Sequence, residues 1–108
     1  MNALLTLDGL SAPLRSLRLL AADFPDLPGP VVDVSTIYPD RLSLSWHTGQ
    51  GGFASFEAWR AALGIHPATI DFHVQCDGRT GVMQAQTFYG GAHIALTGYT
   101  QVAPGDAA

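Results

Sequence analysis

The chain contains no lysine, and its only basic side chains are five arginines. Nine acidic residues outnumber them, so the formal net charge is −4. A protein that binds nucleic acid without sequence preference uses basic patches to displace counterions from the phosphates. The charge balance therefore disfavours a nucleic-acid binder. Absent lysine beside many Ala, Gly and Pro residues is also typical of GC-rich genomes, so we expect a bacterial source.

The chain has a single cysteine, Cys76, which excludes an internal disulfide and any zinc site built from several cysteines. Its place on the predicted inner face of a strand favours an inert buried thiol. No apolar run approaches the length that spans a bilayer. The N-terminus lacks the basic start of a signal peptide, and Asp8 interrupts its apolar stretch. We expect a cytoplasmic protein that does not enter a membrane.

Groups for acid–base or nucleophilic chemistry are also scarce. Glutamate occurs once, and the serines match no nucleophile-elbow motif. Asp71 and His73 could form a dyad, but such a pair on an exposed strand is more typical of a solvated face. The four histidines are too dispersed along the predicted strands to share a metal ion. We therefore name no catalytic residue, no metal ligand and no cofactor, and expect a non-catalytic protein.

Apolar residues make up 47% of the 108 positions, enough for one domain with a modest core. The pattern predicts the fold class α+β: a single small domain with an antiparallel sheet of about five strands and two helices on one face, in the order α-β-β-α-β-β-β. The predicted parts are a helix at 11–24, a hairpin at 31–47, a helix at 55–63, a three-stranded meander at 68–102 and a tail at 103–108.

The meander is the clearest part of the pattern, because apolar and polar residues alternate from position 69 to position 76. Asp77-Gly78 and Gly90-Gly91 predict the two turns, the first of two or four residues. These turns pair Phe72 with Met83 and Ala85 with Leu96. We expect Phe72 and Ile94 to be buried under the helices, with Trp46 and Trp59 close together.

The first hairpin is predicted from Val31–Tyr38 and Leu42–His47. Placing the apolar residues of both strands on one face requires Val34 opposite Trp46. This register predicts a three-residue loop or a bulge at Pro39–Arg41.

In the first helix Ser11 is the expected N-cap. Its expected apolar stripe comprises Leu10, Leu14, Leu17, Leu20, Ala21 and Phe24. Leu4–Leu7 either extends this helix or forms a short strand. In the second helix Gly64 fits the left-handed position after the last turn, with Ile65 folding back.

A glycine-rich loop precedes the second helix. Gly49, Gly51 and Ala54 match the spacing of a dinucleotide-binding motif, but the strands that follow form a meander rather than a parallel crossover. Relief of backbone strain is therefore the favoured interpretation. The alternative is a small ligand-binding, anion-binding or catalytic α+β domain that uses the loop Gly49–Gly52, with Gly49, Gly51 and Gly52 as the anion-binding residues at the start of the helix.

The outward face of the meander is polar but has little charge, and it carries exposed aromatic rings. This composition is typical of an interface. The candidate interface residues are His73, Val82, Gln84, Phe88, His93, Thr97 and Tyr99. We also expect Ala92–Tyr99 to be an edge strand without Lys or Pro to protect it from pairing. The predicted function is an accessory or regulatory protein-interaction domain that binds a protein partner or itself, as a homodimer.

Overall fold

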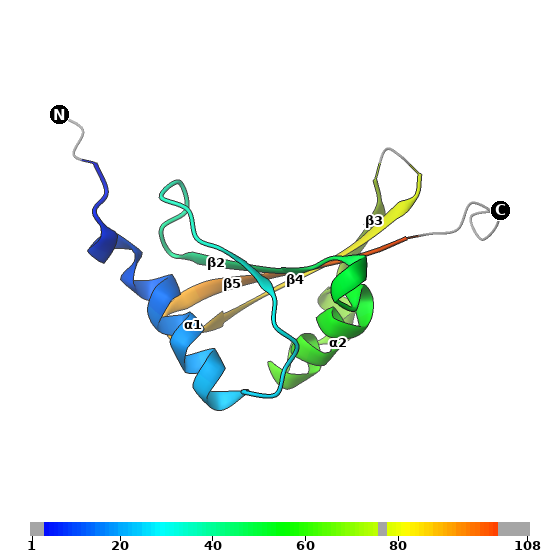
Figure 1. Ribbon diagram of the computed structural model, residues 1–108, viewed down its shortest axis with the longest axis horizontal. Helices are drawn as coiled ribbons and strands as arrows, with labels where there is room; N and C mark the ends of the chain where they lie inside the picture. The colour runs from blue at the N-terminus through cyan, green and yellow to red at the C-terminus, as the bar shows by residue number, and fades with distance from the viewer. Residues whose placement is uncertain (1–3, 76–77, 102–108) are drawn as a thin grey trace.

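The computed structural model describes residues 4–75 and 78–101. Two helices, α1 (Ser11–Asp23) and α2 (Gly52–Ala62), lie on one face of a five-stranded sheet (Figure 1). The strands are β1 (Val31–Asp33), β2 (Arg41–Trp46), β3 (Asp71–Val74), β4 (Thr80–Tyr89) and β5 (Ala92–Gln101). Three short 3-10 segments join them, η1 (Leu7–Leu10), η2 (Thr48–Gln50) and η3 (Pro67–Thr69). The predicted α+β class and element order are confirmed, and within the described residues neither helix has the length and apolar character needed to cross a bilayer.

The strand order across the sheet is β1-β2-β5-β4-β3. All neighbouring pairs are antiparallel except β2 and β5, which run parallel, so the sheet is mixed rather than wholly antiparallel. After β2 the chain passes through α2 to the far edge, and the meander then returns toward the middle. This route places β5 beside β2. No local turn specifies a parallel pair, because parallel strands are joined by long crossovers.

The expectation that Ala92–Tyr99 lies at an edge is wrong. The strand is central, with β2 on one side and β4 on the other, so its backbone groups are paired along both flanks. The two edge strands have only three and four residues. Very short edge strands are one way in which a sheet avoids pairing with another chain.

The predicted register of the meander is confirmed at every position tested. Phe72 lies opposite Met83, and Ala85 lies opposite Leu96. The ladder continues past β3, where the Gln75 amide donates to the Thr80 carbonyl at 2.8 Å. The predictions for the tip of this hairpin, including the buried thiol at Cys76, fall outside the described residues.

Phe72 faces the side expected for it but is not buried. Its ring meets Phe53 of α2 edge-on at 6.1 Å between centroids, yet 55% of Phe72 remains exposed. The cause is its place on an edge strand, which has a neighbour on one side only. The other core predictions are confirmed: Ile94 is fully buried, and the Trp46 and Trp59 rings lie 5.4 Å apart.

The predicted register of the first hairpin is wrong. Val32 lies opposite Leu44, and the connection spans residues 34–40 instead of a tight loop or bulge at Pro39–Arg41. Within it the Ser35 hydroxyl accepts a hydrogen bond from the Ile37 amide, so a side chain stabilises the longer loop. The observed register differs from the predicted one by an even number of residues. The side chains of both strands therefore still point to the faces expected for them.

Helix α1 begins at Ser11, but its N-cap is Leu10, which makes no side-chain cap hydrogen bond. Residues 4–6 have no regular structure and η1 follows, so neither expectation for Leu4–Leu7 is confirmed. The buried stripe also differs, because Leu14 is exposed while Ser16 is fully buried. The Ser16 hydroxyl donates to the Tyr89 carbonyl at 2.7 Å, which explains a polar residue at that position.

The core lies between the sheet and the two helices. Its buried members include Leu20, Leu42, Leu44, Trp46, Phe56, Trp59, Ile94 and Leu96. The linker between α1 and β1 crosses this region (Figure 1). The Pro28 carbonyl in this linker accepts hydrogen bonds from both tryptophan indoles. After α2, Gly64 has φ 69° and the Ile65 amide donates to the Arg60 carbonyl, as predicted.

Candidate functional site

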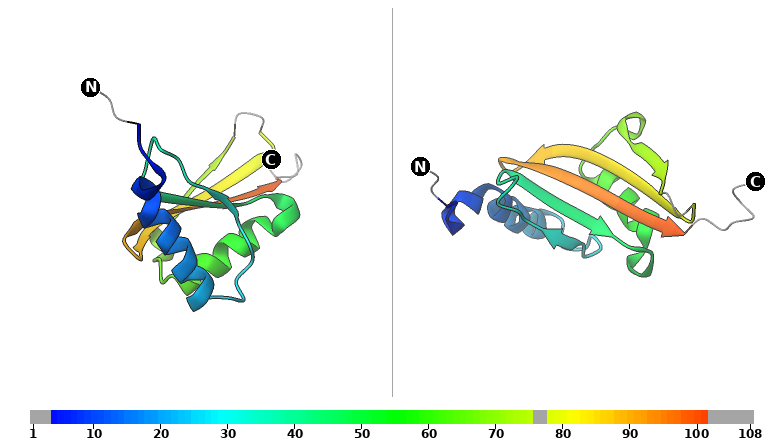
Figure 2. Two further views of the ribbon diagram at one scale, coloured as in Figure 1. Left: turned by 60° about the vertical axis from the view of Figure 1, so that its left-hand side comes forward. Right: turned by 90° about the horizontal axis from the view of Figure 1, so that it is seen from above.

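Both helices lie on one side of the sheet, and neither covers the other side (Figure 2). We call this second side the open face. Side chains alternate across a strand, so Leu42, Leu44 and Trp46 of β2 point to the helices. The intervening residues, Arg41, Ser43 and Ser45, belong to the open face and are partly exposed. The open face is therefore a broad surface built by all five strands.

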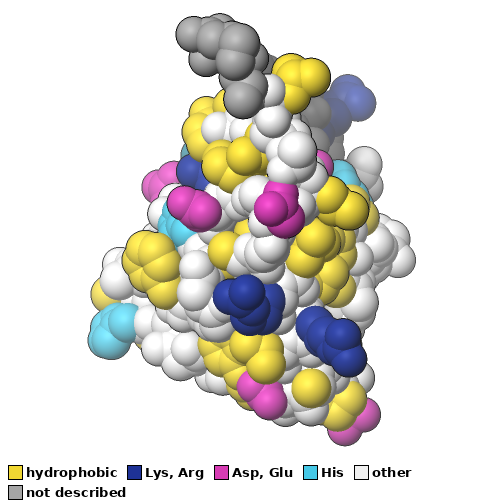
Figure 3. All heavy atoms as spheres, turned by 90° about the vertical axis from the view of Figure 1, so that its left-hand side faces the viewer, with side chains coloured by type: hydrophobic (Ala, Val, Ile, Leu, Met, Phe, Trp, Pro, Cys, Tyr) yellow, Lys and Arg dark blue, Asp and Glu magenta, His cyan; other side chains and the backbone are white. Residues whose placement is uncertain are grey.

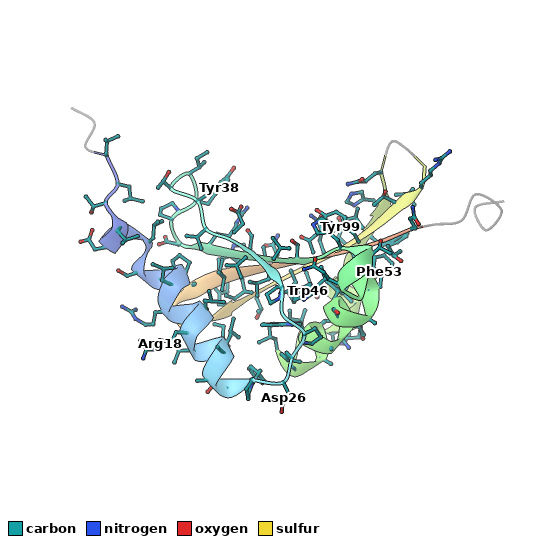
Figure 4. All side chains as sticks on the ribbon, viewed as in Figure 1. Arg18, Asp26, Tyr38, Trp46, Phe53 and Tyr99 are labelled. Atoms are coloured by element: carbon teal, nitrogen blue, oxygen red, sulfur yellow. The ribbon has the colours of Figure 1, made fainter. Side chains whose placement is uncertain are left out.

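The middle of the open face carries small side chains. Ser43 lies beside Ala95, and Ser45 lies beside Thr97, across the parallel pair of strands. All four residues are partly exposed. Small side chains here let another molecule approach the sheet closely. Larger side chains occur toward the two ends, where Tyr38 and Tyr99 lie (Figure 4).

At one end the His47 ring stacks on Tyr99, with 4.8 Å between centroids and nearly parallel planes. Val82 lies beside Tyr99 on the next strand and is only 2% exposed. His47 and Tyr99 border a hollow of about 670 Å³ that is open to solvent. Its lining includes Gly49 and Gln101 and contains no charged side chain among the described residues. The hollow suits a neutral, hydrogen-bonding ligand better than an ion.

The opposite end carries an apolar cluster around an arginine. The Arg41 guanidinium lies over the Tyr38 ring at 4.4 Å, and the His93 ring lies 5.2 Å from Phe88. Register places Arg41 beside His93, which joins the two pairs. The exposed fractions of Ile37 and Phe88 are 76% and 78%. We call Asp33, Ile37, Tyr38, Arg41, Phe88 and His93 the Arg41 patch.

The two charged residues of the Arg41 patch lack ionic partners. Asp33 and Arg41 line the same small hollow, of about 210 Å³, together with Tyr38. Neither side chain has a hydrogen-bond or ion-pair partner within the described part of the chain. The Arg41 Nε atom is buried without a partner, a costly arrangement for a donor. Figure 3 views the molecule from this end and shows exposed hydrophobic side chains among charged ones.

The predicted interface residues do not form one cluster. Phe88 and His93 lie in the Arg41 patch, while His73, Val82 and Tyr99 occupy one row at the other end. Gln84 and Thr97 lie between these groups. Sequence reasoning missed the exposed pair Ile37-Tyr38, although an apolar pair directly before Pro39-Asp40 signals an exposed turn, and it also missed Arg41 and Asp33.

The glycine-rich loop has a structural explanation. A Cβ atom on Gly52 would lie 2.3 Å from the Tyr99 carbonyl, so α2 can begin this close to β5 only with glycine there. The Ala54 and Ser55 amides already donate to the Gly51 carbonyl. An anion at the start of α2 would compete with these bonds. Of the three predicted anion-binding glycines, Gly49 lines the hollow beside His47 and Tyr99.

The groups with shifted pKa values lie on the helix side. A hydrogen bond from Arg60 lowers the pKa of Glu57, and the same bond raises the pKa of Arg60. A hydrogen bond with Asp23 raises the pKa of Tyr89. Among the described residues, no three histidines or acidic side chains come together as a metal site.

We also compared the chain with known proteins. No protein-family model, characterised protein or solved structure shows significant similarity to it.

Proposed function

We propose that this chain is a non-catalytic interaction domain that binds protein through the open face of its sheet. The Arg41 patch carries this proposal. Its exposed apolar residues surround an arginine that has no ionic partner. Aromatic residues and arginine are the residue types enriched at the energetic centres of protein interfaces.

The rest of the open face supports the same role. The small residues between its two ends permit a close approach, and its low charge reduces the desolvation cost of a contact. Binding by strand addition at Ala92–Tyr99 is excluded, because that strand is central. The expected setting, a bacterial cytoplasm, remains a prediction.

Site-specific photo-crosslinking in cells of the source organism tests this function. A photoreactive phenylalanine analogue replaces Phe88 or Thr97 on the open face, and Leu14 or Ala61 on exposed helix surfaces as matched controls. We expect discrete protein adducts from the open-face positions, identifiable by mass spectrometry. Equal adducts from the helix positions, or none from the open face, would contradict the proposal.

A second candidate is favoured by the hollow beside His47 and Tyr99. Its neutral, amide- and hydroxyl-bearing lining could bind a small polar ligand next to the glycine-rich loop. NMR titration with inorganic phosphate and, separately, with neutral sugars distinguishes an anion site from a neutral one. Shifts at Gly49 and Gln101 with either probe would support this candidate, and unchanged shifts at millimolar probe would end it.

A further inference from the structure

The Arg41 patch carries both halves of an ion pair, and we propose that its occupant is a second copy of this chain. This inference rests on the proposed function and specifies the partner. In a twofold dimer the same surface faces itself, so residue i of one copy meets residue j of the other and the reverse. Arg41 of each copy would then pair with Asp33 of its partner copy.

The charges make this arrangement self-complementary. Asp33 and Arg41 belong to neighbouring strands of the open face and line one hollow, yet they are not paired with each other. The Tyr38 ring lies 4.4 Å from the guanidinium, a cation–π contact that restrains the Arg41 side chain before any partner arrives. A fixed side chain loses less conformational entropy on binding. A rotation of 180° about an axis between the two residues exchanges them and makes two intermolecular pairs.

The exposed apolar residues of the patch are consistent with the same twofold arrangement. Ile37 and Phe88 are the most exposed large side chains of the patch. A second copy would cover both and would supply a carboxylate to the guanidinium of Arg41, which has no ionic partner among the described residues. The chain as a whole has a net charge of −4, which opposes association. The two intermolecular Arg41–Asp33 pairs would offset part of this repulsion where the copies meet.

Charge reversal gives a sharp test. Arg41→Asp puts acidic side chains at both positions of the proposed pair, and Asp33→Arg puts basic side chains at both, so each variant should repel its own copies at these positions. Sedimentation velocity should show self-association weakened about tenfold or more in each single variant. A mixture of the two variants should restore dimers, because each chain then meets the opposite charge. The double variant Arg41→Asp with Asp33→Arg should dimerise like the wild type.

Matched controls come from the helix side. Arg18→Asp and Asp26→Arg make the same changes in net charge at exposed positions away from the open face (Figure 4). They should leave the wild-type dimer intact. Circular dichroism of every variant checks that the fold is retained.

Three results would overturn the inference. These are a wild type that stays monomeric to millimolar concentration, single patch variants that associate like the helix-side controls, and a mixture that fails to recover. None of these results tests the proposed function, which the crosslinking experiment tests separately. There, an open-face adduct with a different protein would support the proposed function but not the dimer. An adduct of twice the mass of this chain would support both.

Discussion

Gly98 shows how one residue sets the distance between a helix and the sheet. It lies on the helix side of β5, and a Cβ atom there would sit 2.7 Å from the Phe56 Cβ. Phe56 is fully buried, so it has no space to move aside. The absence of a side chain at position 98 therefore allows α2 to pack directly on the central strand.

Replacing this glycine should strain the core. Gly98→Ala is expected to cost about 1–3 kcal/mol of unfolding free energy, as overpacking of a filled core does. The control is Gly29→Ala, where a Cβ atom meets nothing within 4 Å. Urea denaturation measures both, and equal stabilities for the two variants would contradict the packing described for α2.

Two phenylalanines of different burial give a second test. Phe56→Ala should cost about 3–5 kcal/mol, because it removes a buried ring and leaves a cavity. Phe72→Ala should cost about 1 kcal/mol, because only part of its surface leaves water on folding. Thermal and urea unfolding of both variants measure the difference. A Phe72 variant as unstable as the Phe56 variant would mean that the edge strand is covered in solution.

At the scale of elements, the end of α2 depends on Arg60. Its guanidinium forms a bidentate ion pair with Glu57 and also donates to the Ile65 carbonyl at 2.6 Å. It therefore connects the last turn of the helix to the chain after Gly64. The pair is partly exposed, so its contribution to stability is small.

The pH dependence of this pair has a definite sign. The pKa of Glu57 is lowered below its usual 4.5 in the folded state. The contribution of the pair is thus present above the unfolded pKa and is lost as the pH falls through the folded pKa. Glu57→Gln should lower stability slightly at neutral pH and match the wild type in acid. Urea titrations at both pH values test this, and a difference that grows in acid would contradict it.

The elements differ in how far the sequence predicts them. The meander was predictable in detail, because Gly90-Gly91 and the alternation around Phe72 specify local pairing. Only one such register puts the apolar side chains of neighbouring strands on the same face. The register of the first hairpin was not predictable, because a longer loop leaves the apolar side chains on the same face. Ser35 stabilises that longer loop. The parallel contact of β2 with β5 has no local signal at all, and it alone decides which strands are edges.

At the scale of the whole molecule, the helices leave the open face uncovered. Its existence was predictable from the polar alternation of the meander, and Phe88 and His93 were expected there. The Arg41 patch was not predictable, because it joins β1, β2 and their connection to β4 and β5 through the parallel pair. A surface assembled across that contact appears only in three dimensions.

The central claim is the proposed association of two copies of this chain through the open face. The most direct measurement is a series of amide NMR spectra of the purified wild type from low micromolar to millimolar concentration. We predict concentration-dependent shifts confined to the open face, largest around Arg41, Phe88 and His93. Shifts on α1 and α2 instead, or a spectrum that does not change across the series, would contradict the account.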